Sequence, residues 1–334
     1  MKMKIIDMHC DTISALYDRK AEGISLRNND GHIDLQRMKG SGYLLQNFAL
    51  FVQLQRDGDP WERVCSLYAY YQEQLEKNSD MIAPVLAFSD IAKNEAAGKL
   101  SAMLTVEEGA VCKGEIEKLH KLYCMGVRML TLTWNFVNEL GQPNFDRSLR
   151  ERSLELYLHT PNLTGGLTEK GREFVARMEE LGMIPDVSHL SDAGFYDVLS
   201  VTKKPFVASH SNARSICACV RNMTDDMIRR LSDRGGCMGL NFCADFLEEK
   251  PVGEHNAGTV ESVVRHARHI ADVGGVEVLG LGSDFDGIDT HEELPGAQSM
   301  EVLWEALKRG GFTERQLDGI FYQNVLRVYK DTLK

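Results

Sequence analysis

Eight short apolar segments recur along this chain, and segments with the apolar spacing of helices separate them. The apolar segments are of strand length and span residues 5–9, 44–52, 102–106, 127–133, 183–188, 206–209, 237–242 and 278–282. Strands that alternate with helices favour parallel pairing, because each helix returns the chain to the starting edge of the sheet. Eight such units predict an α/β fold, a closed (β/α)8 TIM-like barrel.

Capping residues support helices between these strands. Thr168 precedes the segment 169–181, whose apolar residues recur on one face. Thr224 is followed by two aspartates, whose negative charge suits the start of a helix. Thr313 and Gln316 match a capping box and predict the start of the last helix.

The whole chain, residues 1–334, is interpreted as one domain. No linker, charge block or low-complexity tract divides it, and its length suits a single α/β barrel. Hydrophobic residues make up 43% of the chain and charged residues 26%, which is typical of a globular protein. The segment 138–166 is polar and contains two prolines, so we expect a long loop over the barrel mouth.

Net charge and hydropathy indicate which classes of partner and which cellular compartment suit this chain. The net charge of −11 disfavours a nucleic-acid partner, because such proteins carry a basic face for phosphates. No apolar run approaches the ~18 residues of a membrane-spanning helix, so we expect no membrane contact and a cytoplasmic location. The eight cysteines are dispersed without a CxxC pair, which favours reduced thiols in that compartment.

Metal-ligating types of side chain follow five of the predicted strands. In a barrel, the carboxyl ends of all strands meet at one face, where active sites lie. Taken singly, each of these residues has an ordinary explanation as a core histidine, a solvated carboxylate or a turn cap; their coincidence at strand ends points to one shared site. The residues are His9, Asp11, Glu107, His189, His210 and Asp284.

The chemistry of this set suits divalent metal ions. His9 and Asp11 are two residues apart, so strand alternation would place them on one face. Imidazole and carboxylate without clustered thiolates suit Zn²⁺ or a similar ion. Even five of these six residues are too many ligands for one catalytic ion that keeps an open position, which suggests two ions that share a carboxylate. His266 and His269, on a predicted helix, are expected on its outer surface.

Five motifs in order along the chain resemble the membrane (renal) dipeptidase family of binuclear zinc metallopeptidases, in its bacterial form. The family is part of the metal-dependent hydrolase superfamily, so the resemblance implies the same (β/α)8 barrel. It extends over nearly the whole chain, and the order and spacing of the motifs are its most specific part. The motifs are DMHCDT, TVEEG, GLTEKGREFVARMEELGMIPDVSHLS, ASHSNARSICACVRNMTDD and GLGSDFDG.

The resemblance assigns metal ligands residue by residue. It implies that His9 and Asp11 bind one zinc ion, that His189 and His210 bind the other, and that Glu107 bridges both. Glu107 is preferred to its neighbour Glu108 because it directly follows the strand valine, as the family's ligand does. Two cations beside one water would lower the pKa of that water and leave a bridging hydroxide as the nucleophile.

The resemblance also assigns catalytic and substrate-binding residues. Asp284 matches the carboxylate that would take a proton from the attacking water and pass it to the leaving amine, with Asp286 as its competitor. Arg221 matches the arginine that would bind the free carboxylate of a dipeptide, a role suited to a planar guanidinium. Family members are often dimers, so a homodimer is expected by resemblance.

One position departs from the best-known members of the family. Trp134 stands where those members place a histidine near the scissile carbonyl. An indole N–H donates one hydrogen bond but cannot carry the charge of an imidazolium. Asn135 is expected to help there, or the metal alone polarises the carbonyl. We interpret the change as one of subgroup and substrate preference.

The sequence therefore predicts a cytoplasmic enzyme with two zinc ions that hydrolyses dipeptides, including L-L and L-D ones. One alternative within the hydrolases is an amidohydrolase for another small amide, such as an N-acyl amino acid or a β-lactam-like ring. A second alternative is a catalytically inactive barrel that binds peptides. A metal-dependent aldolase or isomerase is disfavoured, because no glycine-rich phosphate cradle follows the last predicted strands.

Overall fold

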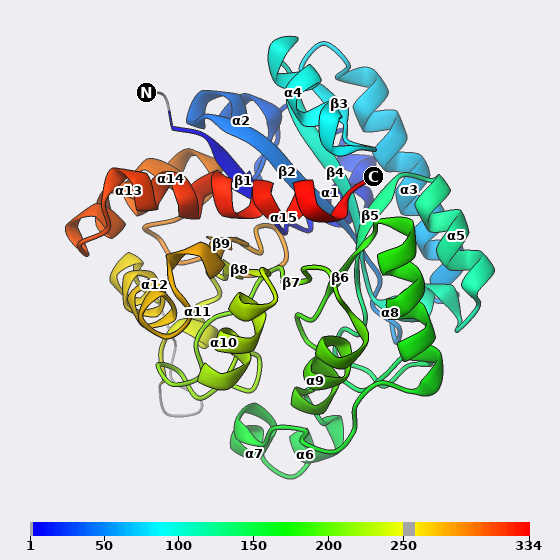
Figure 1. The fold of residues 1–334 in the computed structure, drawn as a ribbon. Helices are drawn as coiled ribbons and strands as arrows, with labels where there is room; N and C mark the ends of the chain where they lie inside the picture. Colours follow the sequence, from blue (N-terminus) through cyan, green and yellow to red (C-terminus); the bar gives the residue numbers. More distant parts are fainter. Residues whose placement is uncertain (1–2, 250–257) are drawn as a thin grey trace.

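A closed barrel of parallel strands, surrounded by helices, forms the centre of the molecule (Figure 1). The structure is a computed structural model and describes residues 3–249 and 258–334. The strands are hydrogen-bonded in the order β2-β1-β9-β8-β7-β6-β5-β4, and β2 pairs with β4 to close the ring. Because the pairings are parallel, the strands all end at one face of the barrel. The predicted (β/α)8 barrel is confirmed.

The eight barrel strands correspond to the eight predicted segments, and several are shorter than predicted. The strands are β1 (Ile5–Asp7), β2 (Tyr43–Phe51), β4 (Leu100–Glu107), β5 (Val127–Thr131), β6 (Ile184–Asp186), β7 (Val207–Ala208), β8 (Cys237–Leu240) and β9 (Leu279–Leu281). The longer helices are α1 (Thr12–Asp18), α2 (Leu35–Ser41), α3 (Pro60–Lys77), α4 (Phe88–Ala96), α5 (Ile116–Cys124), α8 (Glu169–Leu181), α9 (Asp192–Val201), α10 (Asp225–Asp233), α12 (Val260–Gly274), α13 (Met300–Arg309) and α15 (Asn324–Thr332).

A ninth strand, β3 (Ile82–Pro84), is absent from the sequence prediction. It pairs with residues 100–102 of β4, whereas β5 pairs with residues 104–107. The strand β3 therefore extends the sheet beside β5 and lies outside the ring. Three residues that end in proline are too few to show an alternating pattern.

The barrel interior is apolar, and α15 covers its amino-terminal end (Figure 1). Thr332 and Arg327 of α15 lie close to Gly182 and Gly235, which stand two residues before β6 and β8. The phenol of Tyr329 donates a hydrogen bond of 2.9 Å to Asn47 Oδ1. The buried cluster that joins α15 to the strands includes Ile6, Met8, Leu45, Met103, Met129, Ile184, Val207, Val325, Val328 and Tyr329.

The predicted helix starts are confirmed at three positions. The hydroxyl of Thr168 accepts a hydrogen bond of 3.0 Å from the N–H of Gly171, at the start of α8. Thr224 caps α10 in the same way. Thr313 and Gln316 form the predicted capping box at α14 (Glu314–Asp318). One π-helical turn over residues 319–323 joins α14 to α15.

The segment 138–166 contains two short helices, α6 (Arg147–Arg150) and α7 (Leu154–His159), so it is more ordered than the predicted loop. Tyr157 is buried. The N–H of Val220 donates a hydrogen bond of 2.8 Å to the carbonyl oxygen of Leu158. This segment therefore rests on the chain that carries Arg221.

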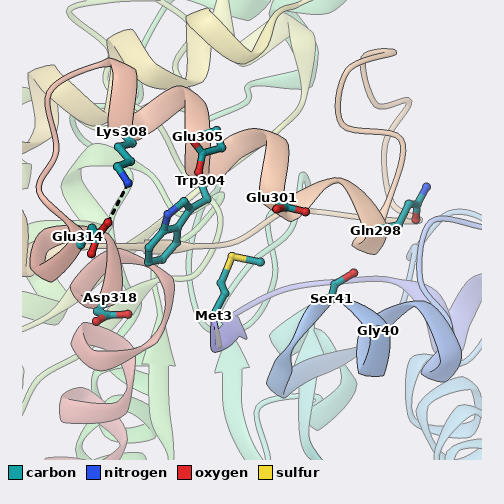
Figure 2. A pocket seen from close by; sticks show the side chains of 10 residues that line it. All are labelled: Met3, Gly40, Ser41, Gln298, Glu301, Trp304, Glu305, Lys308, Glu314 and Asp318. Atoms are coloured by element: carbon teal, nitrogen blue, oxygen red, sulfur yellow. Dashed lines mark hydrogen bonds and ion pairs between the residues drawn. The ribbon is translucent and has the colours of Figure 1, made fainter. Parts of the chain in front are cut away.

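A cavity of about 570 Å³ lies beside Met3, ahead of β1 (Figure 2). Trp304 borders it, and Lys308 and Glu314 form an ion pair of 2.8 Å at its edge. The cavity contains none of the predicted site residues. In the described part of the chain, no helix combines the length and the apolar character that crossing a membrane requires.

Candidate metal centre

His9 and Asp11 lie beyond the end of β1, in the short segment that leads into α1. The strand ends at Asp7, and α1 begins at Thr12. His9 Nε2 lies 3.9 Å from Asp11 Oδ2, and both residues are buried. Cys10 forms a parallel bridge with Phe285, and the side chains of His9 and Asp11, which flank Cys10, converge.

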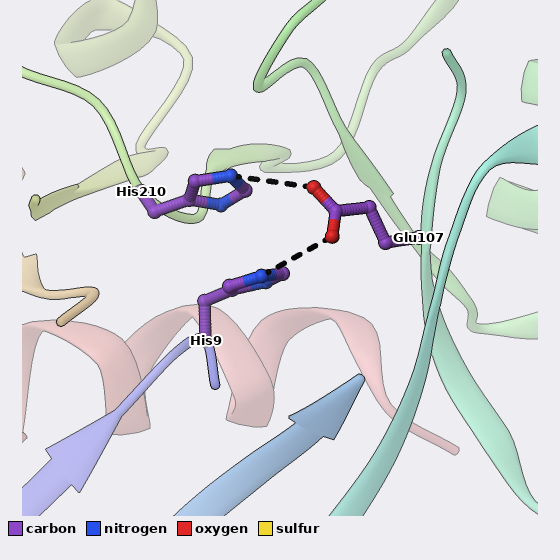
Figure 3. A group of neighbouring side chains, drawn as sticks. All are labelled: His9, Glu107 and His210. Atoms are coloured by element: carbon purple, nitrogen blue, oxygen red, sulfur yellow. Dashed lines mark ion pairs between the residues drawn. The ribbon is translucent and has the colours of Figure 1, made fainter. Parts of the chain in front are cut away.

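The two carboxylate oxygens of Glu107 face different groups. Oε2 lies 3.5 Å from His9 Nε2, while Oε1 lies 3.1 Å from His189 Nε2 and 3.5 Å from His210 Nε2. Figure 3 shows one oxygen of Glu107 directed at His9 and the other at His210, whose rings are stacked on each other. With Asp11, which lies beside His9, the five predicted ligands form one buried cluster around Glu107.

Glu108 points away from this cluster. One of its oxygens accepts a hydrogen bond of 2.8 Å from the N–H of Ala110, and the other accepts one of 3.2 Å from the N–H of Trp134. Asn138 donates a further bond to it. Burial raises the pKa of Glu108 to about 7. The structure thus separates the two glutamates: Glu107 belongs to the cluster, and Glu108 anchors the chain after β5.

Hydrogen bonds determine which ring nitrogen of His210 carries a proton. The hydroxyl of Ser209 donates to Asp186 Oδ2 at 2.6 Å. Its oxygen therefore accepts from His210 Nδ1, which lies 2.7 Å away. With the proton on Nδ1, the Nε2 lone pair of His210 faces Glu107.

His189 is held in the same tautomer by Asn135. His189 Nδ1 lies 2.9 Å from Asn135 Oδ1, and an amide oxygen can only accept, so Nδ1 carries the proton. His189 itself has a positive φ of 68°, a strained conformation for a residue other than glycine. Asn135, predicted to contact substrate, thus contacts a predicted metal ligand.

Asp284 and Asp286, the two candidates for the catalytic carboxylate, have different surroundings. Asp284 Oδ1 lies 3.8 Å from His9 Nε2, within the cluster. Asp286 accepts hydrogen bonds of 2.5 Å from the hydroxyl of Thr12 and 2.6 Å from the N–H of His32. Asp286 therefore holds two loops together, and only Asp284 faces the predicted ligands.

Arg221 and Trp134 lie on either side of His189. Arg221 is buried, and it donates a hydrogen bond of 3.0 Å to the carbonyl oxygen of His210. Its Nε has no hydrogen-bond partner. The Trp134 ring lies 6.2 Å from the ring of His189 and 5.0 Å from that of Phe51, measured between centroids.

Comparison with known proteins places this geometry in a family. The model of the membrane dipeptidase family, peptidase family M19, matches residues 1–334. The chain belongs to this family. It is accordingly a metal-dependent dipeptidase, and its buried imidazoles and carboxylates include two groups that could hold a divalent metal ion.

Relatives and solved structures of the family cover the chain almost completely. A protein of Schizosaccharomyces pombe named an uncharacterized dipeptidase is 29% identical over 98% of this chain and 80% of its own length. The crystal structure of dipeptidase AC, an M19 metallopeptidase, matches with a TM-score of 0.89 at 26% identity, over 100% of this chain and 99% of that one. A Rhodobacter sphaeroides metallopeptidase, liganded with a phosphinate mimic of the dipeptide L-Ala-D-Ala, matches with a TM-score of 0.88 at 25% identity, over 99% and 100%.

Unpaired polar atoms show that the donor set fits the metal ions of this family. The Nε2 atoms of His189 and His210 are 3.0 Å apart and both carry lone pairs, so no hydrogen bond can join them. His9 Nε2 and Asp11 Oδ1 are buried without a hydrogen-bond partner. A divalent cation satisfies such atoms, because it accepts several lone pairs at once.

The pKa shifts in the cluster also indicate that bound cations would stabilise it. Burial raises the pKa of Asp11 to about 6 and that of Asp284 to about 7, and neighbouring carboxylates add to both shifts. Burial lowers the pKa of His189 to about 4. Burial also opposes charge on His9, but Glu107 and Asp11 outweigh it and raise the pKa of His9 well above its ordinary value. Cations would relieve the repulsion between these carboxylates.

The sequence prediction missed the residues that support the ligands. Asp7 accepts hydrogen bonds from the N–H of His9 at 3.3 Å and from the hydroxyl of Ser283 at 2.6 Å. Asp186 accepts from Ser209 in the same manner. One signal could have found them: each aspartate is the last residue of a strand and precedes a predicted histidine ligand by two or three positions.

His266 corrects a prediction away from the cluster. It is fully buried, whereas the sequence placed it on the outer surface of its helix. His266 Nδ1 accepts a hydrogen bond of 3.1 Å from the N–H of Ala213, and Nε2 lies 3.0 Å from the carbonyl oxygen of Leu247. His269, half-buried, pairs with Asp225 at 2.8 Å. Both histidines connect helix α12 to its neighbours.

Proposed function

We propose that this dipeptidase hydrolyses the single peptide bond of free dipeptides with two zinc ions. The observation that carries the proposal is the position of Glu107, whose Oε2 faces His9 and whose Oε1 faces His189 and His210. His9 and Asp11 would hold one ion, His189 and His210 the other, and Glu107 both. The imidazole and carboxylate donors suit zinc, and five ligands suit a pair of ions that share one carboxylate.

The metal pair, when bound, activates water and neutralises negative charge on the reacting carbonyl. The chain's own residues do the remaining work. Asp284 takes the proton that the attacking water loses, and it returns that proton to the amine nitrogen as the C–N bond breaks. Its position beside His9 places it within the cluster.

Arg221 is proposed to bind the free carboxylate of the substrate. Its guanidinium is buried, and its Nε lacks a partner, so it has donor capacity left for an anion. Because Arg221 would bind the terminal carboxylate so close to the proposed metal ligands, only very short peptides would be cleaved. The R. sphaeroides structure with its dipeptide mimic supports this size of substrate.

Trp134 is proposed to border the substrate, while Asn135 is proposed to orient His189. The Trp134 ring stands between Phe51 and His189, where it offers an apolar wall and one N–H donor. Asn135 holds His189 by the hydrogen bond to Nδ1. The chemistry at the carbonyl then depends on the metals and on Asp284, without a histidine at position 134.

The proposal extends to compartment and assembly. All eight cysteines are unpaired, which supports a reducing compartment and hence the cytoplasm. The homodimer remains an expectation from the family resemblance, and light scattering of the purified protein would measure it.

Metal analysis combined with activity on wild type and Glu107→Ala tests the proposed function. Wild type is expected to hold two zinc ions per chain and to release free amino acids from L-L and L-D dipeptides, but not from N-acyl amino acids. Because Glu107 contacts both groups of ligands, Glu107→Ala should lose metal and at least about a thousandfold of activity. A matched control is Glu95→Ala, which removes an exposed ion pair with Lys4 at the far end of the barrel. Unchanged activity of Glu107→Ala would refute the bridging role.

A further inference from the structure

A buried chain of three asparagines connects the segment of Arg221 to Asp284. Asn222, Asn212 and Asn241 are at most 1% exposed. The N–H of Asn212 donates a hydrogen bond of 3.2 Å to Asn222 Oδ1. Asn241 Nδ2 donates one of 3.0 Å to Asp284 Oδ2. None of these asparagines belongs to the predicted ligands or to the predicted substrate-binding residues.

The orientation of the Asn241 amide follows from the direction of its hydrogen bonds. The backbone N–H of Cys243 can only donate, and it lies 2.7 Å from Asn241 Oδ1. The amide nitrogen of Asn241 must therefore be the atom that faces Asp284. Asn241 is held in place by Asn212, which donates to its carbonyl oxygen at 2.9 Å and accepts from its N–H at 3.1 Å.

This arrangement distinguishes the two oxygens of Asp284. Oδ2 is occupied by the amide of Asn241, while Oδ1 faces the cluster, 3.8 Å from His9 Nε2. The terminal torsion of an aspartate is broad, so an unrestrained carboxyl rotates easily between orientations. A donated hydrogen bond to one oxygen fixes that torsion and leaves the other oxygen free for proton transfer.

We infer that Asn241 is the positioning residue of the reaction, which holds the carboxyl of Asp284 so that Oδ1 is the oxygen that exchanges the proton. This inference rests on the proposed function. An O–H bond of the attacking water breaks, and its proton passes to Oδ1. The proton then passes from Oδ1 to the amine nitrogen of the product as the C–N bond breaks. The side chain of Asn241 is hydrogen-bonded to Asp284 and to the N–H of Cys243, so it acts through Asp284.

The same three asparagines also link Asp284 to Arg221, the residue proposed to bind the carboxylate of the substrate. Asn222 follows Arg221 directly, and the N–H of Met223 donates a hydrogen bond of 2.8 Å to the carbonyl oxygen of Asn212. Asn212 thus joins the segment of Arg221 to Asn241. Asp284, which transfers the proton, and Arg221, which binds the end of the substrate, are therefore connected by one hydrogen-bond network. This network keeps the distance between them constant.

Two variants of Asn241 test the inference by different routes. Asn241→Asp keeps an oxygen for the N–H of Cys243 and removes the donor to Asp284, whereas Asn241→Ala removes both bonds. Both should lower kcat between about tenfold and a hundredfold, because misplacing the acid–base group forfeits part of its contribution. KM for the dipeptide should change less than about threefold, and two metal ions should remain bound. The matched control is Asn94→Ala, another buried asparagine, whose amide donates to the carbonyl oxygens of Ala83 and Pro84. It should lower the melting temperature and leave kcat unchanged.

A double-mutant cycle with Asp284→Ala completes the test. If Asn241 acts through Asp284, adding Asn241→Ala to Asp284→Ala should lower the residual kcat by less than about twofold. Equal losses in both backgrounds, or a raised KM with unchanged kcat, would overturn the positioning role. A wild-type protein that cleaves no dipeptide would overturn the proposed function, and the inference with it. An active wild type with an impaired Asp284→Ala and a fully active Asn241→Ala would overturn the inference alone.

Discussion

The two halves of the proposed metal site are both supported by an aspartate and a serine, but only one of these serines contacts a histidine ring. In the β1 half, which contains His9 and Asp11, Asp7 accepts from the N–H of Ser283 at 3.0 Å and from its hydroxyl at 2.6 Å. In the β6 half, which contains His189 and His210, Asp186 accepts from the N–H of Ser209 at 2.9 Å and from its hydroxyl at 2.6 Å. Only Ser209 also contacts an imidazole.

This difference affects the protonation of the histidines in each half before a cation binds. In the β6 half, Ser209 and Asn135 hold both imidazoles with the proton on Nδ1, and the pKa of each lies below its ordinary value, so both rings stay neutral. In the β1 half, the carboxylates around His9 raise its pKa well above the ordinary value. We therefore expect the proposed β1 half to release more protons on binding metal than the β6 half.

The largest expected effect is that of Gly287→Ala, which disturbs Asp11 of the β1 half and the neighbouring Asp284. A Cβ at Gly287 would lie 2.2 Å from Asp11 Oδ2 and 2.8 Å from Asp284 Oδ1, so both carboxylates would have to move. We expect one of two metal ions to be lost and kcat/KM to fall at least about a hundredfold, measured by metal analysis and steady-state kinetics. Gly40→Ala, in α2, meets no atom within 4 Å and serves as the control. Retention of both ions with wild-type kinetics would show that the halves are not separable at this glycine.

A smaller effect is expected from Ser209→Ala, which removes the contact that makes the halves differ. Without Ser209, His210 loses the acceptor that keeps the proton on Nδ1. Metal affinity of the β6 half should weaken about tenfold to a hundredfold, measured by competition with a chelator. Ser283→Ala is the matched change in the β1 half, and it should alter metal affinity less than about threefold. Equal effects of the two serines would contradict the comparison.

The smallest effect concerns the acid sensitivity of the fold, which must be known before the pH dependence of the two halves is compared. Burial lowers the pKa of His266 to about 4. Between pH 6.5 and 4 the unfolded chain binds a proton at this residue and the folded chain does not, so stability falls as pH falls. The loss from pH 6.5 to pH 5 should be about 2 kcal/mol in the metal-free protein. Urea unfolding of wild type and His266→Gln at both values measures it. A variant with the same pH dependence as wild type would exclude His266 as the source.

Local patterns account for most of what could be predicted. The barrel follows from eight apolar segments of strand length, and the starts of α8, α10 and α14 follow from their capping threonines. The strand β3 escaped prediction because three residues show no period. His266 was misplaced because helix periodicity identifies one buried face, whereas α12 also packs against the chain around Ala213. A side chain between two such contacts is buried outside the main apolar stripe.

What the sequence by itself determined is the closed barrel and the set of residues gathered at its carboxyl ends, because both depend on residue types and on spacing along the chain. Only the tertiary structure decided that Glu108 anchors the chain after β5, that Ser209 orients His210, and that Asn241 holds one oxygen of Asp284. Those outcomes depend on which atoms of distant segments meet, and on the direction in which each donor points. No local pattern of residues carries that information.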